Sequence, residues 1–373
     1  MKILFISNDP TIFEENSSAR SRMRSYAEAI GELHILSQGA KTSDEQEGAL
    51  FLHSIRPLPT KLGRVFLLWT LSRRAHRLVK KSGIEIVSAQ DPFEHGAIAK
   101  SAVHHTNAKL HVQVHTDFCS RYFSEESIKN RLRMIIADNV LPHADGIRAV
   151  SNRVKNSLVA RYGTRISLPV VIPIAMETKV ANKSVEPFSI SSKFSFMIMA
   201  VGRLEKEKRL EDAIRVVAIL AKKKYPVALV IVGDGSEKEK LNSLAKKLGI
   251  EKRVMFLGWR NDIHELLSHA QAFIQTSAYE GYGRTYIEAA LADVPMVVTN
   301  VGIIGDVFIN KESALVCDVS DIRCLERSME TLIEENDTRY KITYNAHNVA
   351  DAHIKAVGDT VARTVEDFER LLA

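Results

Sequence analysis

The sequence predicts an α/β protein built from two doubly wound parallel sheets. Short β-branched segments alternate with helical patterns of about 10–15 residues along the chain, as expected of consecutive βαβ units. The chain has 373 residues, which suits about two domains of ordinary size. A polar segment without periodicity, Glu177–Lys193, separates two such halves and is typical of a linker.

Taken in order, the elements define four parts. We expect a first domain over residues 1–180, a linker over 181–193, a second domain over 194–350, and a final helix over 351–373 that can pack back on the first domain. The strands predicted in the first half are Ile3–Ser7, His34–Leu36, Ile84–Ser88, Leu110–His115, Gly146–Val150 and Val170–Pro173. Those predicted in the second half are Phe196–Val201, Val227–Val232, Val254–Leu257, Ala272–Thr276, Met296–Thr299 and Ala314–Val316.

Two helices of the second half carry local signals. Arg209–Lys224 places apolar residues on one face at helical spacing, which predicts a helix packed on the core. The run Ser236-Glu237-Lys238-Glu239 predicts a capping box at the start of a second helix, and Gly249 predicts its end.

Composition excludes several classes of protein. Apolar residues make up 45% and charged residues 26% of the chain, which argues against a disordered, collagenous or disulfide-rich protein. The longest apolar run, Val65–Leu71, is too short to span a bilayer, and the first eight residues lack the length and flanks of a secretory signal. Cys119, Cys317 and Cys324 are too few and too scattered for a disulfide framework or a zinc site. We therefore expect a cytoplasmic protein.

Basic residues are concentrated in part of the first half. Residues 51–185 hold 21 basic and 9 acidic residues. Within them, Lys61–Lys81 has the pattern of a basic amphipathic helix with an interfacial Trp69. A solvated basic face explains this pattern, and so does attraction to an anionic membrane surface, which would place the protein peripherally on the inner face of the membrane. Nucleic acid is not expected as a partner, because aromatic and basic residues do not interleave.

Common nucleotide and metal motifs are missing from the sequence. Ser7-Asn8-Asp9-Pro10 follows the first strand where a dinucleotide fold would place Gly-x-Gly-x-x-Gly. The chain also lacks a Walker A loop and an Asp-x-Asp pair. These observations argue against a dehydrogenase, an NTPase and a metal-dependent transferase of the single-domain type.

Candidate binding residues gather where strands of the second half end. Gly202 and Arg203 close one strand, and Lys208 precedes the next helix. Ligands of doubly wound sheets bind at this edge, and two cations beside a helix N-terminus suit a diphosphate. A second loop, Thr276 to Ala289, combines glycines with two acids, Glu280 and Glu288. Its glycines allow close approach of a ligand to the backbone, and Glu288 could accept from a ribose diol.

These motifs resemble those of the retaining glycosyltransferases of family 4 (group 1), which have the GT-B fold. The resemblance covers most of the chain and is strong from about Met199 to Asp318. Its matching pieces are Val201-Gly202-Arg203-Leu204 with Glu207-Lys208, Val232-Gly233-Asp234-Gly235, Phe256-Leu257-Gly258-Trp259, and Glu280 to Glu288 with Pro295. In the first half the match is looser and includes His115 and Val171-Ile172-Pro173.

The resemblance implies two Rossmann-like domains facing an interdomain cleft, of which the first would bind the acceptor and the second would hold most of the nucleotide-sugar donor. It also implies that neither a metal nor another cofactor is required. Arg203 and Lys208 would bind the donor diphosphate, Glu280 the transferred sugar, and His115 would approach that sugar from the first domain. The remaining donor-binding positions would be Gly202, Trp259, Arg260, Gly281, Tyr282, Gly283, Arg284, Thr285 and Glu288. The acceptor would be a glycan or a lipid-linked glycan, as in polysaccharide or cell-envelope biosynthesis.

Several positions depart from the family pattern. Ser17 and Ser18, followed by Arg20, stand where paired glycines are usual, which makes them a candidate phosphate loop. Arg209 and Asp293 also replace glycines; Asp is among the less costly replacements if that glycine has a positive φ. Two alternatives therefore stay open beside the transferase: a sugar-nucleotide epimerase of the same fold, and a non-catalytic module that binds a sugar nucleotide.

Overall fold

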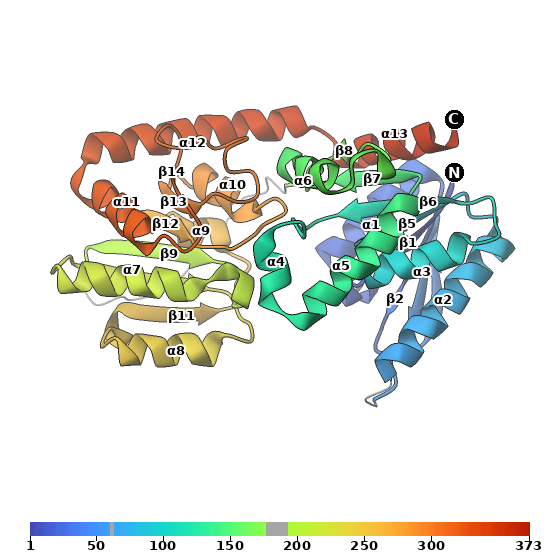
Figure 1. Ribbon diagram of the computed structural model, residues 1–373, viewed down its shortest axis with the longest axis horizontal. Coiled ribbons are helices and arrows are strands. Elements are labelled where there is room, and N and C mark those ends of the chain that lie inside the picture. Colours follow the sequence, from blue (N-terminus) through green and yellow to red (C-terminus); the bar gives the residue numbers. More distant parts are fainter. Residues whose placement is uncertain (60–62, 177–192) are drawn as a thin grey trace. The chain divides into compact units, whose positions relative to one another are not determined.

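The computed structural model describes residues 1–59, 63–176 and 193–373. The chain forms two compact units, the first from Met1–Pro173 and Asp359–Ala373, the second from Ile174–Gly358 (Figure 1). The predicted linker, apart from Lys193, lies outside the described residues. The stretch predicted as one final helix is divided at Gly358, whose φ is +60°, and its second part belongs to the first unit.

The described part of the first unit contains an eight-stranded sheet in the order β3-β4-β2-β1-β5-β6-β7-β8. Every neighbouring pair is parallel except β3 and β4. In chain order the elements are β1 (Lys2–Ile6), η1 (Pro10–Phe13), α1 (Ser18–Ile30), β2 (Glu32–Gln38), β3 (Ser43–Glu47), β4 (Leu50–Ile55), α2 (Gly63–Ser82), β5 (Ile86–Ala89), α3 (Glu94–Val103), β6 (Lys109–Val114), α4 (Arg121–Glu126), α5 (Ile128–Val140), η2 (Leu141–His143), β7 (Gly146–Ala149), α6 (Asn152–Tyr162), η3 (Gly163–Arg165), β8 (Val170–Val171) and α13 (Thr360–Leu372).

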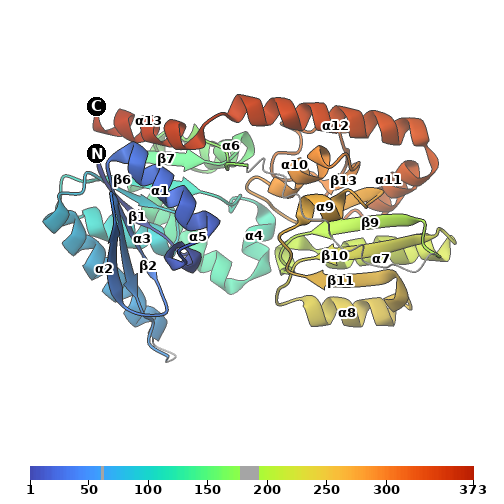
Figure 2. The same ribbon diagram turned by 180° about the vertical axis from the view of Figure 1, so that it is seen from behind.

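Alternation along β1 divides the core of this unit between the two faces of the sheet. Ile3 and Phe5 join a buried cluster with residues of α1 and with Phe368 of α13. The chain crosses the sheet in one direction from β1 to β2 and in the opposite direction from β4 to β5. The right-handed crossover rule therefore places α2 on the face opposite α1. Figure 2, which is turned by 180° from Figure 1, shows α1 in front of the strands.

The described part of the second unit contains a six-stranded parallel sheet in the order β11-β10-β9-β12-β13-β14. Its elements are β9 (Phe196–Val201), η4 (Lys206–Lys208), α7 (Leu210–Lys222), β10 (Val227–Val232), α8 (Lys238–Lys247), η5 (Glu251–Arg253), β11 (Val254–Gly258), α9 (Ile263–Leu267), β12 (Ala272–Gln275), α10 (Arg284–Leu291), β13 (Met296–Thr299), β14 (Leu315–Cys317), α11 (Ile322–Glu334) and α12 (Asn336–Val357). One core layer packs α7 and α11 against inward residues of β9 and β10. Two parallel α/β sheets therefore confirm the predicted fold class.

Three local expectations are wrong. Strands β3 and β4 were not predicted; they form an antiparallel pair at the edge of the first sheet. The expected capping box does not form: α8 begins at Lys238 without a side-chain cap, and the Ser236 hydroxyl donates instead to Glu205 at 2.7 Å.

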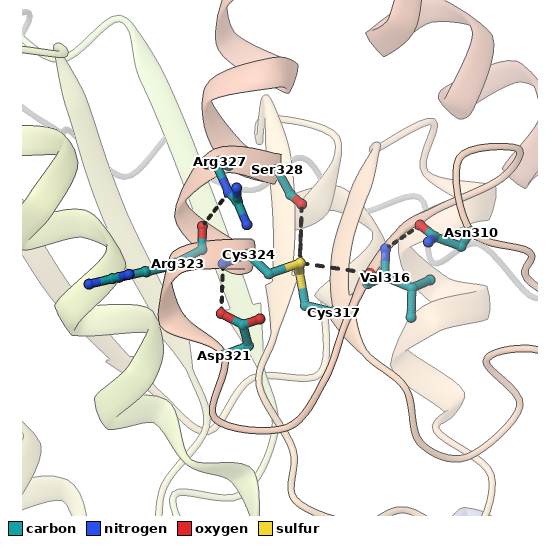
Figure 3. The surroundings of a disulfide bond; sticks show 8 residues. All are labelled: Asn310, Val316, Cys317, Asp321, Arg323, Cys324, Arg327 and Ser328. Carbon is teal, nitrogen blue, oxygen red and sulfur yellow. Dashed lines mark hydrogen bonds between the residues drawn. A yellow bond between two sulfur atoms is a disulfide. The ribbon is translucent and has the colours of Figure 1, made fainter.

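The third correction concerns the cysteines. Cys317 and Cys324 form a disulfide bond, with Cα atoms 5.7 Å apart (Figure 3). Cys317 ends β14, and the carboxylate of Asp321 accepts from the backbone N–H of Cys324, starting α11 so that its first turn returns to the strand end. Seven residues of separation therefore suffice for a pair that looked scattered in the sequence.

Candidate active site

The candidate site of the second unit lies where β9, β12 and β13 end. Parallel strands bring their carboxyl ends to one edge, so the loops after these strands meet there. The loop after β12 is joined to the loop before α7: the Thr276 hydroxyl donates to the carbonyl oxygen of Lys208 at 2.9 Å, and the Ala278 N–H donates to that of Glu207 at 2.7 Å. This linkage fixes Lys208 beside the glycine-rich loop.

Glu280 is the centre of the polar contacts at this edge. Its Oε1 accepts from Lys208 Nζ at 2.5 Å, from Gln275 Nε2 at 2.7 Å and from the Ser277 hydroxyl at 2.9 Å. In the described part of the chain no hydrogen bond reaches Oε2, so this oxygen is left for a ligand hydroxyl. The structure thus brings together two of the predicted residues, Lys208 and Glu280.

Gln275 and Ser277 are functional candidates that the sequence analysis missed. The Gln275 carbonyl oxygen accepts from the Thr285 hydroxyl at 2.5 Å while its NH₂ group donates to Glu280. One buried amide therefore orients both the acid and the first turn of α10. A signal was present, because Gln275 is a polar residue at the end of an otherwise apolar strand.

The start of α10 depends on Gly283. Its φ is +89°, and a Cβ there would lie 2.2 Å from the Tyr286 ring, so a side chain would clash as well as strain the backbone. No side chain caps this helix, which leaves N–H groups of its first turn, including those of Arg284 and Thr285, open toward an anion.

Glu288 lies one turn further along α10. Its carboxylate is 3.7 Å from the Arg284 guanidinium, and burial raises its pKa although Arg284 opposes the shift. Gly302, after β13, approaches the loop closely, since a Cβ there would lie 2.5 Å from the carbonyl oxygen of Tyr282 and 3.0 Å from Glu280 Cβ. The backbone at Gly302 therefore packs directly against the loop that carries Glu280.

Five further predicted positions of the second unit lie in different surroundings. Arg203 leaves 76% of its side chain exposed and pairs with Glu207 at 2.9 Å, beside Gly202 but outside the Glu280 network. The Tyr282 hydroxyl forms a hydrogen bond with His353 of α12 at 2.8 Å. Because the ring is held there, the loop would contact a nucleotide-sugar donor at this position through its backbone. Trp259 is 75% exposed at the end of the edge strand β11. Arg260 pairs with Asp262. Gly281 lies within the loop itself.

His115 and the candidate phosphate loop belong to the first unit. Burial, reinforced by the charge of Arg148, lowers the pKa of His115 to about 3, so the ring is neutral near pH 7; its Nε2 donates to Gln113 at 3.2 Å.

The side chains of the candidate phosphate loop are engaged locally. Ser17 caps α1 by accepting from the Arg20 N–H at 3.0 Å, Ser18 is the first residue of that helix, and Arg20 pairs with Glu47 at 2.9 Å. Capping and ion pairing therefore account for Ser17 and Arg20.

Residues 1–59, 63–176 and 193–373 contain neither a candidate metal-ion cluster nor a helix that could span a membrane. No group of three or more His, Cys, Asp or Glu side chains is arranged to hold a metal ion in this part of the chain. Within the same residues, no helix combines the length and the hydropathy that crossing a membrane requires.

Two family models match consecutive parts of the chain. Residues 19–179 match the model described as Glycosyltransferase Family 4, and residues 186–349 match Glycosyl transferases group 1. The chain belongs to the group 1, family 4 glycosyltransferases. The second match contains Lys208, Glu280 and Glu288, and so the whole candidate donor site.

Solved structures show that this family-4 chain has the GT-B fold. It superposes with a TM-score of 0.72 on Anabaena HepE in complex with UDP and glucose, at 21% identity over 98% of this chain and 99% of that one. With sucrose-phosphate synthase from Thermosynechococcus elongatus the TM-score is 0.79, at 17% identity over 100% and 99% of the two chains.

Curated relatives match over shorter stretches. The chain is 28% identical to the lipopolysaccharide core biosynthesis glycosyltransferase LpsE of Rhizobium meliloti over 151 residues, 40% of this chain and 43% of that protein. It is 30% identical to a glycogen synthase of Mycobacterium tuberculosis over 140 residues, 37% of this chain and 34% of the synthase. The matched parts thus span about half the length of these relatives, or less.

Proposed function

We propose that this glycosyltransferase moves a sugar from a nucleotide-sugar donor to a hydroxyl group of a glycan or lipid-linked acceptor, with retention of anomeric configuration. The observation that carries the proposal is the Lys208–Glu280 contact, which brings a cation to an acid of the glycine-rich loop whose Oε2 accepts no hydrogen bond in the described part of the chain. A uridine diphosphate sugar is the first donor to test, because HepE was crystallised with UDP-glucose.

The residues of the site suit the charge that develops during transfer. As the bond between the sugar C1 and the diphosphate oxygen breaks, the electron pair stays on the diphosphate. Lys208, Arg203 and the open N–H groups of α10 stabilise that charge; losing one such group typically slows a reaction about 100- to 1000-fold. The acceptor oxygen bonds to C1 on the same face, and its proton passes to the departing diphosphate.

The two acids take different parts in binding. Glu280 holds a sugar hydroxyl through Oε2, while its Oε1 stays on Lys208, Gln275 and Ser277. Glu288, partly buried on α10, accepts from the ribose hydroxyls of the nucleotide. His115, neutral near pH 7, can exchange a hydrogen bond with the sugar without adding charge.

Lys208→Ala tests this proposal, with Lys206→Ala as the matched control because Lys206 is an exposed lysine of the same short turn. We expect Lys208→Ala to lower transfer about 100-fold or more, with a much smaller loss of thermal stability. Transfer is measured as product formed from UDP-, GDP- and ADP-sugars that raise the melting temperature of the wild type. Equal activity of the two variants would contradict the assignment.

The same assay separates the alternatives. A sugar-nucleotide epimerase would convert its donor without an acceptor, releasing a free sugar with inverted configuration. A non-catalytic module would show a thermal shift with a sugar nucleotide but no turnover with any acceptor. Retained configuration in a transfer product excludes both.

An anionic membrane surface is the partner we propose for the first unit, at the cytoplasmic face of the membrane. A groove of about 930 Å³ between α2 and α3 is lined by Arg73, Arg77, Lys80, Lys81 and Lys100, and its described lining holds no carboxylate. Trp69, 52% exposed at the groove, lies under the Arg73 guanidinium at 4.7 Å. Leu67 and Leu71 are buried, so these leucines of α2 pack on the protein core and do not face lipid. Lys61 and Leu62, with the side chains of Arg64 and Val65, lie outside the described residues.

Vesicle sedimentation tests this surface against a merely solvated basic face. We expect binding to phosphatidylglycerol vesicles that weakens with salt, little binding to phosphatidylcholine, and loss of binding in the double variant Arg77→Glu/Lys80→Glu. The control, Lys246→Glu/Lys247→Glu on α8, makes the same change in net charge elsewhere and should still bind. Equal binding by both variants would rule the groove out.

A further inference from the structure

The Cys317–Cys324 disulfide of the second unit lies between two cavities. The first, of about 340 Å³, is lined by both cysteines together with Asp318 and Asp321, and its described lining holds no lysine or arginine. The second, of about 650 Å³, is lined by Cys324 but not by Cys317. Both volumes fall within the range of about 300–1,000 Å³ that is usual for small-molecule sites. Each side of the bond therefore faces a space that a small molecule can enter.

The second cavity, called the basic cavity below, differs from the first in charge. In the part of the chain that the structure describes, its three cationic side chains are exposed and none of them is held in an ion pair. In Figure 3, Arg327 lies on one side of the disulfide and Asp321 on the other. An anion is thus attracted to the side from which Cys324 is reached, and repelled from the other. The charged residues that line the basic cavity are Lys311, Arg327, Lys341 and Glu335.

The two sulfur atoms differ in access. Cys317, at the end of β14, is 3% exposed, whereas Cys324, in the first turn of α11, is only partly buried. The hydroxyl oxygen of Ser328, one turn further along α11, lies 3.5 Å from Cys317 Sγ and 4.0 Å from Cys324 Sγ. A thiolate that attacks Cys324 leaves the electron pair of the broken bond on Cys317, where Ser328 can donate a hydrogen bond to it. Access and leaving-group stabilisation therefore both favour attack at Cys324.

Cys119 of the first unit provides a comparison within the same chain, because it is a free cysteine. Burial, reinforced by the nearby Asp117 carboxylate, raises the pKa of its thiol to about 12. Thiol–disulfide exchange requires the thiolate, which is scarce near pH 7 when the pKa is so high. We therefore expect Cys119 to exchange slowly.

We propose that the basic cavity takes a small anionic thiol, which forms a mixed disulfide with Cys324. The incoming thiolate bonds to Cys324 Sγ as the bond to Cys317 Sγ breaks, and the Cys317 sulfur takes up a proton from solvent. The incoming sulfur is thereby oxidised to the disulfide level and Cys317 is reduced to a thiol. A second molecule of the thiol removes the first as a symmetric disulfide and leaves Cys324 reduced. This modification of the second unit does not depend on the proposed function.

Three thiols of one length test the preference for an anion. Mercaptoethanesulfonate, mercaptoethanol and cysteamine share a two-carbon chain that ends in an anion, a neutral hydroxyl and a cation. Loss of the disulfide from the wild type is followed by acid quenching, alkylation and mass spectrometry. Each rate constant is expressed per thiolate and divided by that for a neutral small-molecule disulfide, which corrects for ionisation and nucleophilicity. We expect the corrected rate to be about tenfold higher for the sulfonate than for cysteamine, and salt to narrow the difference.

Charge reversal tests whether the basic cavity causes this preference. In Arg327→Glu/Lys341→Glu we expect the order to invert, so that cysteamine reacts fastest. The control, Lys246→Glu/Lys247→Glu, makes the same change in net charge outside the cavity lining and should keep the wild-type order. Equal corrected rates for the three thiols in the wild type would overturn the proposal. An unchanged order in the cavity variant, or an inverted order in the control, would overturn it too.

The point of attachment is determined in a variant that cannot reform the bond. In Cys317→Ala, Cys324 is the thiol left at the basic cavity. Its thiolate attacks the symmetric disulfide of mercaptoethanesulfonate, keeps one half and releases the other as a thiolate. Peptide mapping should find the added group on Cys324 and little on Cys119. Modification of Cys119 at a comparable rate would contradict the proposal, and so would a wild type whose three cysteines are all alkylated without reductant.

Discussion

Two residues keep a left-handed backbone where the family pattern has glycine. Arg209 has φ +48° and Asp293 has φ +56°. Both positions lie at junctions between elements: Arg209 directly precedes α7, and Asp293 lies between α10 and β13. Asp tolerates this conformation better than most residues, and Arg209 gains an ion pair with the buried Asp212 at 2.8 Å. The turn geometry is thus preserved although the glycines are not, and Lys208 keeps its place.

At the residue scale, the lowered pKa of His115 predicts that the first unit loses stability in acid. Because its pKa falls from the ordinary 6.5 to about 3 on folding, the unfolded chain binds more protons between these values. Stability then rises with pH over this window: the contribution is complete above about pH 6.5 and is lost as pH falls toward 3, at up to about 1.4 kcal/mol per pH unit.

Chemical denaturation at several pH values measures this slope. His115→Gln should flatten it by one proton between pH 4 and 6, on the order of 1 kcal/mol per pH unit. Other buried histidines with lowered pKa values, such as His111 and His34, act in the same direction, so the difference between variants is the quantity to read. An unchanged slope would mean that His115 is protonated in the folded state.

At the scale of elements, the sequence predicts what periodicity and apolar runs reveal. All six strands of the second sheet were predicted within about two residues, because each is an apolar run between turns. Strand β3, Ser43–Glu47, consists only of polar residues and was missed. Contacts with other elements hold this strand in place, such as the hydrogen bond at 2.6 Å between Asp44 and His53 of β4. No local pattern reports such a contact.

The loops of the candidate site likewise contain residues that the sequence predicts and residues whose roles only the fold reveals. Lys208, Glu280 and Glu288 were predicted from their positions at strand ends and beside glycines, and again from a resemblance of motifs. The roles of Gln275 and Ser277 follow from a hydrogen-bond network that only the fold assembles. Ser236 failed as a cap because Glu205, 31 residues away, offers its hydroxyl a better-placed acceptor. Local capping rules do not include such competition.

The Cys317–Cys324 disulfide predicts a redox-dependent stability of the second unit. Closing a loop of this length removes unfolded-chain entropy worth about 2 kcal/mol. We expect the double variant Cys317→Ala/Cys324→Ala, or the wild type in reductant, to lose roughly that amount in chemical denaturation. The variant should be insensitive to reductant. A wild type whose stability does not change on reduction would contradict a contribution from this bond.

At the scale of the whole molecule, the chain passes from one unit to the other twice, at Pro173–Ile174 and at Gly358–Asp359. The last helix, α13, completes the unit that begins at Met1. Phe368 is fully buried there, with its ring 6.0 Å from Phe5 and 5.0 Å from His111. A residue near one end of the chain thus stabilises a core formed by the other end.

This arrangement predicts which unit responds to a change in α13. Phe368→Ala should cost about 3–5 kcal/mol, as expected for a buried aromatic, and should lower the melting of the first unit. Leu372→Ala, on the same helix but 37% exposed, should cost far less. Because Lys208, Glu280 and Glu288 lie in the second unit, a sugar nucleotide should still raise that unit's transition in Phe368→Ala by calorimetry. Loss of the donor-induced shift, with the first unit's transition unmoved, would show that α13 supports the donor unit instead.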